Sequence, residues 1–168
     1  MEPQDIYSKL IALLDAAGAR YRVVEHIPAG QTELVSQIRG NLLAQAVKSL
    51  VVLVKISKKE RRYVLVNLPG DRRVDLHAVK ALCGGEHALF APAEKARDLT
   101  GCEMGAVPPF SFDPALLVLL DPALLEHEEL VFNAGRLDRS VFIHTQDYLA
   151  VARPTVAVVT MPPQENPA

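Results

Sequence analysis

Lys48 is the residue whose type and position in this sequence best suit chemistry. It stands between Val47 and Ser49, at the start of the apolar run 50–54, whose branched side chains predict a fully buried strand. A lysine at the edge of a core strand either extends its ammonium group to water or is held there to act on a bound group. The neighbouring residues leave both interpretations open.

The loop from Gly101 to Phe110 is the second candidate for chemistry. Gly105 permits a positive φ and a close approach of the backbone to a ligand, and Pro108 and Pro109 stiffen the chain that follows. Such a loop can present backbone N–H groups to a carbonyl or carboxylate oxygen. A tight turn before a strand would explain the same residues.

A second glycine loop, residues 132–139, carries Asn133, Gly135, Arg136 and Arg139. Guanidinium groups suit phosphate because they present their N–H donors in a planar fork. An ordinary hairpin turn with a charged tip is the alternative interpretation of this loop.

The sequence lacks the motifs that mark several other chemistries. The chain has no glycine-rich phosphate loop, no HExxH zinc motif and no GxSxG nucleophile motif, and its five histidines are scattered. His26, in a turn beside Pro28, is placed to reach a cleft. The two cysteines, Cys83 and Cys102, predict neither a zinc site nor a disulfide framework, and Cys102 suits a small buried filler. We therefore expect no metal and no cofactor.

Length and composition predict a single domain over residues 1–155, followed by an extension, residues 156–168, with a partly flexible Pro-rich tail. The chain has 168 residues, 49% of them hydrophobic, which is enough for a sizeable core. Its formal net charge of -2 gives no global signal for nucleic acid but allows a local basic patch. The polar N-terminus and the lack of a membrane-spanning apolar run predict a cytoplasmic protein with reduced cysteines and no membrane partner.

Helices and strands are expected in an irregular order, with a charged hairpin tip at residues 57–62. Without regular βαβ alternation, this order predicts an α+β fold with a curved mixed sheet rather than a doubly wound one. Periodicity and turn residues predict helices over 5–17, 33–38, 75–82, 93–99 and 146–152, a helical turn over 42–46, and strands over 21–24, 50–54, 63–67, 87–90, 116–120, 130–132 and 141–143.

Five segments give the chain a family resemblance. They are RVVEHIPAG (22–30), SQIRG (36–40), QAVKSLVV (45–52), DLTGCEMGAVPPFSF (98–112) and FNAGRLDRSV (132–141). In this order the chain resembles the YbaK/ProX family of aminoacyl-tRNA editing domains, which stand alone or are inserted in bacterial prolyl-tRNA synthetases, and above all its YeaK-like branch. The resemblance implies a curved mixed sheet or barrel-like core surrounded by helices.

The resemblance also implies an activity, a trans-editing deacylase that hydrolyses the ester between a wrongly attached small amino acid and its tRNA. Lys48 matches the key lysine of the family, and Gly105 and Pro108 match a Gly-x-x-Pro loop that lines the amino-acid pocket. Ser49 stands where some members have Asn. The family acts on alanyl, cysteinyl, seryl or threonyl esters, and the YeaK-like appearance favours Ser, Thr or Ala.

The implied site divides into a catalytic residue, substrate-binding residues and phosphate contacts. Lys48 would anchor the terminal phosphate or the ester carbonyl, the loop backbone would orient the aminoacyl group, and the ribose hydroxyl of the substrate would help to activate water. We expect Lys48 and Gly105 to meet in one cleft. The substrate-binding candidates are Ser49, Gly105, Ala106, Val107, Pro108, His26, Asn133 and Gly135, and the phosphate candidates are Arg136 and Arg139.

The expected partner is the acceptor end of tRNA, with an aminoacyl-tRNA synthetase or an elongation factor as a further partner. Two other functions fit the same residues. One is a non-catalytic module that binds a tRNA end or a small ligand without turnover. The other is a regulatory partner of a synthetase, whose binding would survive the Lys48→Ala substitution.

Overall fold

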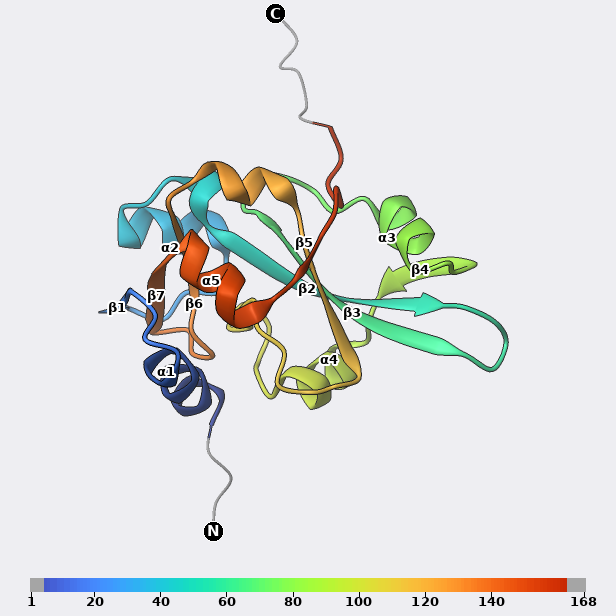
Figure 1. Cartoon of the computed structure of the whole chain (residues 1–168), viewed down its shortest axis with the longest axis horizontal. Helices are drawn as coiled ribbons and strands as arrows, with labels where there is room; N and C mark the ends of the chain where they lie inside the picture. Colours follow the sequence, from blue (N-terminus) through green and yellow to red (C-terminus); the bar gives the residue numbers. More distant parts are fainter. Residues whose placement is uncertain (1–4, 163–168) are drawn as a thin grey trace, which may run out of the picture.

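The computed structural model describes residues 5–162, which form two β-sheets and their covering helices (Figure 1). One sheet has three strands in the order β1-β7-β6, and the other has five in the order β4-β2-β3-β5-β8. The elements are α1 (Ile6–Ala16), β1 (Tyr21–Glu25), α2 (Thr32–Arg39), η1 (Leu43–Gln45), β2 (Val47–Lys55), β3 (Arg61–Pro69), α3 (Leu76–Leu82), β4 (His87–Phe90), α4 (Ala93–Thr100), β5 (Leu116–Leu120), η2 (Pro122–Glu126), β6 (Glu129–Asn133), β7 (Arg139–His144), α5 (Thr145–Ala152) and β8 (Thr155–Val156).

The predicted α+β class with a mixed sheet is confirmed. In the five-stranded sheet, β2 runs antiparallel to β3 and β4, whereas β3 runs parallel to β5 and β5 parallel to β8. Both sheets are open in the described chain, so the core is barrel-like only in its curvature. None of the helices described over residues 5–162 has the length and apolar composition needed to cross a membrane.

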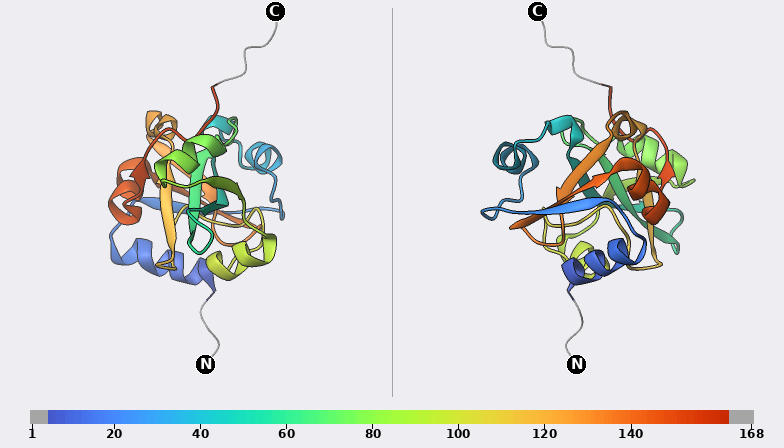
Figure 2. Two further views of the ribbon diagram at one scale, coloured as in Figure 1. Left: turned by 90° about the vertical axis from the view of Figure 1, so that its right-hand side faces the viewer. Right: turned by 60° about the vertical axis from the view of Figure 1, so that its left-hand side comes forward.

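Helices cover both faces of the five-stranded sheet, which explains why the run 50–54 is apolar without alternation. Val52 and Val54 face one side, where they pack with Val79 of α3. Val51 faces the other side, where it packs with Leu99 of α4. Figure 2 shows α3 and α4 on different sides of these strands.

Two local predictions were wrong, and one short helix was not predicted. The central strand β2 begins at Val47 rather than at residue 50, because its ladder with β3 continues to the pair Val47–Pro69. A 3₁₀ helix, η2, follows Asp121, whose side chain accepts a hydrogen bond from the N–H of Ala123. Thr145 is the first residue of α5 rather than its cap, and its hydroxyl donates to the carbonyl of His127.

The short strand β8, which the sequence did not predict, attaches the end of the described chain to the sheet. Just beyond β8, Val159 is fully buried, and its N–H and the hydroxyl of Thr160 both donate to the Asp121 carboxylate. Residues 156–160 therefore pack on the domain. The boundary expected at residue 155 stays a prediction, and residues 163–168 of the expected tail lie outside the described residues.

The strand β2 has a free stretch of edge that positions the site. On its outer side β2 pairs with β4 only from Val52 to Lys55, and an isolated bridge joins Ala46 to Val131 of β6. Residues 47–50 lie between these two contacts, because the Ala91 N–H also donates to the Val51 carbonyl. A cavity opens along this stretch.

Candidate active site

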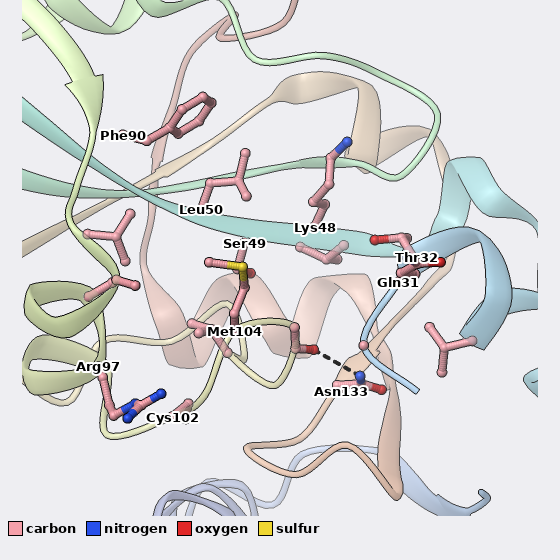
Figure 3. Close-up of a pocket in the computed structure, with 18 of the residues that line it drawn as sticks. Gln31, Thr32, Lys48, Ser49, Leu50, Phe90, Arg97, Cys102, Met104 and Asn133 are labelled. Atoms are coloured by element: carbon pink, nitrogen blue, oxygen red, sulfur yellow. Dashed lines mark hydrogen bonds between the residues drawn. The ribbon is translucent and has the colours of Figure 1, made fainter. Parts of the chain in front are cut away.

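A cavity of about 760 Å³ lies along the free edge of β2, between the start of α2, the segment from β4 to α4, and the loop 101–110 (Figure 3). This volume suits a small-molecule group or the end of a larger substrate. Its walls are formed by Gly30, Gln31, Thr32, Glu33, Val35, Arg39, Val47, Lys48, Ser49, Leu50, Val51, Phe90, Ala91, Ala93, Ala96, Arg97, Cys102, Met104, Gly105, Val107 and Asn133.

The cavity brings together Lys48 and Gly105, as the sequence led us to expect. Lys48 and Ser49 nevertheless leave β2 on opposite faces of the sheet, because side chains alternate along a strand. Figure 3 shows Lys48 on the same side as Leu50, while Ser49 points toward the side of Met104. The cavity wraps around the strand edge and therefore has a Lys48 lobe and a Ser49 lobe.

Lys48 is half-buried rather than solvated. Its Nζ donates a hydrogen bond of 2.9 Å to the carbonyl of Arg72, in the segment after β3. Burial lowers the pKa of Lys48 below its ordinary value of 10.5, while the negative charges of Glu33 and Asp71 oppose that shift. The ammonium group is thus held beside the cavity by a neutral carbonyl and two nearby acids.

Ser49 is anchored to the neighbouring strand. Its Oγ donates a hydrogen bond of 2.6 Å to Oδ1 of the buried Asn67, whose Nδ2 in turn donates to the carbonyls of Leu65 and Leu119. Because the hydroxyl hydrogen is used in this way, the Ser49 oxygen keeps lone pairs that can accept a hydrogen bond from a ligand.

Gly105 has a conformation and an environment that favour glycine. Its φ is +87°, and a Cβ at this position would lie 2.7 Å from the Cα of Gly30. Two backbone segments from distant parts of the chain thus touch at the cavity wall. A side chain at Gly105 would separate them.

Asn133 joins these two segments to the three-stranded sheet. Its Nδ2 donates hydrogen bonds of 2.9 Å to the carbonyl of Ala29 and 2.9 Å to that of Gly105, the bond drawn in Figure 3. Its Oδ1 accepts from Ser140 at 3.0 Å and from Arg39 at 3.4 Å. Because both ends of the amide are engaged, Asn133 serves to position the loop.

The loop 101–110 retains amide groups for a ligand. The N–H of Ala106 donates to Glu103 and its carbonyl accepts from Gly135, and Pro108 has no N–H. Ala106 and Pro108 are buried behind the wall. Within residues 5–162, the N–H groups of Gly105 and Val107 have no hydrogen-bond acceptor, and both residues line the cavity.

The remaining predicted residues lie outside the cavity wall. Nε2 of His26 lies 2.7 Å from the Ser140 hydroxyl, which in turn donates a hydrogen bond to Asn133. Gly135 packs against the start of α1, where a Cβ would lie 3.0 Å from the Tyr7 nitrogen. Arg136 and Arg139 pair with carboxylates, Arg136 with Asp138 at 2.8 Å and Arg139 with Glu25 at 3.5 Å.

The structure adds cations that sequence reasoning missed. Arg39 and Arg97 line the cavity with Lys48, so its described wall carries three cations against the single acid Glu33. Burial lowers the pKa of Arg39 to about 10, and its hydrogen-bond partners in the described chain are all neutral oxygens. This arrangement makes the cavity a local basic site in a chain of net charge -2.

Cys102 is a buried member of the cavity wall, as its expected role of filler requires. Burial raises the pKa of its thiol to about 11, so the nucleophilic thiolate is scarce near neutral pH. Its neighbour Glu103 adds to the shift.

Comparisons with known proteins agree on one family. Residues 26–151 match the model of the aminoacyl-tRNA editing domain. The chain is 45% identical over 149 residues to the multifunctional Ser/Thr-tRNA deacylase ProXp-y of Escherichia coli, covering 88% of this chain and 89% of that protein. It is 31% identical over 114 residues to the proline–tRNA ligase of Bacillus licheniformis, covering 67% of this chain and 19% of the ligase.

Solved structures share the fold over almost the whole chain. A protein described as a candidate trans-editing enzyme for prolyl-tRNA synthetase superposes with a TM-score of 0.77 at 26% identity, covering 96% of this chain and 100% of that one. The hypothetical protein APE2540 superposes with a TM-score of 0.82 at 24% identity, covering 91% of this chain and 99% of that one.

Proposed function

The chain belongs to the family of aminoacyl-tRNA editing domains, and we propose on this premise that it is a trans-editing deacylase for mischarged tRNA. It hydrolyses the ester that links a small amino acid, serine, threonine or alanine, to the tRNA. The observation that carries this proposal is the similarity to a Ser/Thr-tRNA deacylase over most of both chains. The cavity that joins Lys48 to the loop of Gly105 supplies a site for the reaction.

The reaction needs positioning more than a strong nucleophile. An aminoacyl ester is already activated, because the ribose oxygen is a fair leaving group, so an oriented water can hydrolyse it. The ribose hydroxyl of the substrate helps to activate this water. The free N–H groups of Gly105 and Val107 orient the aminoacyl group, and each donor that reaches the developing oxyanion contributes roughly 3 kcal/mol.

Lys48 contributes charge from its own lobe of the cavity. Its Nζ is tethered to Arg72 by one hydrogen bond, which leaves two N–H donors for the ester carbonyl or the terminal phosphate. Glu33 and Asp71 favour the protonated form that this role needs.

The Ser49 lobe suits a small side chain with a hydroxyl. Val107 and Met104 provide apolar walls, and the Ser49 oxygen can accept a hydrogen bond from the hydroxyl of serine or threonine. A pocket of this kind discriminates poorly against one methylene or one hydroxyl, which agrees with a multifunctional preference.

The tRNA partner meets the protein at its acceptor end. The cations Arg39, Lys48 and Arg97 attract phosphate, and Phe90, which is 54% exposed at the cavity wall, offers a face for stacking a base. A small contact of this kind is sensitive to salt. A synthetase or an elongation factor supplies further tRNA selectivity in the cytoplasm, where charged tRNA is used.

A deacylation assay tests the proposal. Radiolabelled tRNAs carrying alanine, serine, threonine, cysteine or proline are incubated with the protein, and the loss of the label is compared with spontaneous hydrolysis. We expect rapid loss from seryl-, threonyl- or alanyl-tRNA and no acceleration for cognate prolyl-tRNA. Tight binding of all five without acceleration would refute the enzyme and favour a binding module.

A further inference from the structure

The backbone N–H and C=O of Ser49 face the cavity and have no hydrogen-bond partner within residues 5–162. Three hydrogen bonds fix the direction in which each residue of β2 points. Gly70 N–H donates to the Ala46 carbonyl on the β3 side, whereas Ala91 N–H and Glu86 N–H donate to the carbonyls of Val51 and Lys55 on the β4 side. Because the direction alternates along a strand, the N–H and C=O of Ser49 point to the same side as those of Val51.

Nothing described on that side pairs with Ser49. The β4 ladder starts at Val52, and the bridge to β6 is at Ala46. Within residues 5–162, no loop or side-chain group forms a hydrogen bond with the N–H or C=O of Ser49. Backbone groups at a cavity wall need a partner, so water or a ligand must supply it.

We propose that this edge binds the aminoacyl group as if it were one residue of an added antiparallel strand. The α-ammonium donates to the Ser49 carbonyl, and the Ser49 N–H donates to the ester carbonyl. This is the pair of bonds that two directly opposite residues exchange in an antiparallel ladder. The inference rests on the proposed function and names the part of the substrate that the edge recognises.

The strand geometry then orients the rest of the substrate. Residues directly opposite each other put their side chains on the same face, so the substrate side chain enters the Ser49 lobe beside Val107. The antiparallel direction puts the ester oxygen and the ribose toward the start of β2, next to Lys48, and the α-ammonium toward Val51. One placement therefore engages both lobes of the cavity.

This recognition requires a donor on the α-carbon. A charge-assisted hydrogen bond contributes more than a neutral one, so a substrate with an α-hydroxyl should react more slowly and one with an α-methyl group more slowly still. We expect enzymatic acceleration over spontaneous hydrolysis to fall by about 10-fold for the hydroxyl and about 100-fold for the methyl group.

Three acylated tRNAs of nearly equal size test the inference: alanyl-tRNA, lactyl-tRNA and isobutyryl-tRNA. Each enzymatic rate is divided by the spontaneous rate of the same ester, which removes the intrinsic reactivity. The ordering alanyl, lactyl, isobutyryl supports the inference. Equal acceleration of all three would overturn it and leave the deacylase proposal standing, whereas no acceleration of alanyl-, seryl- or threonyl-tRNA would refute both.

A backbone substitution separates the main chain of Ser49 from its side chain. The α-hydroxy analogue of serine, introduced at position 49 by nonsense suppression, replaces the N–H by an oxygen and keeps the hydroxymethyl group. The matched control carries serine introduced by the same method. We expect the analogue to lower the maximal rate on alanyl-tRNA at least 10-fold. The melting temperature should fall only slightly, because the ester also makes the Lys48 carbonyl a weaker acceptor in the ladder with β3. Equal rates in the two proteins would contradict the role of this N–H.

Discussion

Replacing Gly105 by alanine perturbs the contact that shapes the cavity wall. Gly105 has φ +87°, and its new Cβ would lie 2.7 Å from the Cα and 2.8 Å from the carbonyl oxygen of Gly30. Ordinary contact begins near 3.4 Å, so the two backbone segments must separate by about 0.7 Å. Gly84→Ala is a matched control, because Gly84 has φ +65° and nothing within 4 Å of the added Cβ.

The cost of each substitution can be worked from these environments. The left-handed backbone costs both variants about 1–2 kcal/mol. The forced separation adds about 1–3 kcal/mol for Gly105→Ala alone. In a chain of 168 residues, 1 kcal/mol lowers the melting temperature by about 2–4 °C. We therefore expect a loss of about 2–8 °C for Gly84→Ala and about 4–20 °C for Gly105→Ala.

Activity separates the two variants further. The displaced loop moves the N–H groups of Gly105 and Val107, and a shift approaching 1 Å can lower a rate by about 100-fold. Single-turnover hydrolysis of seryl-tRNA at 25 °C, below both melting transitions, measures this effect. We expect the rate of Gly84→Ala to equal that of the wild type. A Gly105→Ala protein as stable and as active as Gly84→Ala would refute the reasoning.

Three further substitutions or reagents test single groups. Glu33→Gln should lower the pKa of Lys48 further below 10.5, because the negative charge of Glu33 raises that pKa. An unchanged titration of the Lys48 ¹³Cε signal would contradict this prediction. Cys102 should react with iodoacetamide at pH 7.5 at least about 100-fold more slowly in the native than in the unfolded protein, as followed by mass spectrometry, and comparable rates would contradict its burial. Tyr148→Phe should destabilise the fold by about 1–3 kcal/mol in urea unfolding, because it leaves the Pro109 carbonyl unpaired, and an unchanged midpoint would exclude that bond.

The sequence predicts the strands best where an apolar run is bounded by turn residues. The bounds of β4 and β5 agree with the prediction, because Gly, Pro and Asp residues flank both runs. The start of β2 was not predictable, because Lys48 and Ser49 belong to it only through pairing with β3. Local composition carries no information about such a partner.

The structure brings together the site residues that a family motif marks, but the surroundings of the other candidates could not be predicted. Lys48 and the loop of Gly105 were expected together and share one cavity, but their placement in two lobes depends on the alternation of β2. Asn133, which was expected to bind substrate, lines the cavity, and its amide also ties Gly105 to the sheet. The partners of an amide are set by long-range contacts, so its residue type alone does not distinguish these roles.

The free edge at Ser49 also depends on long-range contacts and not on local sequence. It exists because the β4 ladder begins only at Val52 and the bridge to β6 lies at Ala46. Neither limit follows from residues near position 49. A gap between two pairings emerges only when the sheet is assembled.

The most direct test of the account compares Lys48→Ala with Lys55→Ala, a control at the other end of the same strand. Both proteins should keep the wild-type circular dichroism spectrum, because each loses only a side chain at a partly exposed position. Single-turnover hydrolysis of seryl-tRNA should fall to the spontaneous rate in Lys48→Ala and stay at the wild-type rate in Lys55→Ala. Hydrolysis by Lys48→Ala at nearly the wild-type rate would contradict the account.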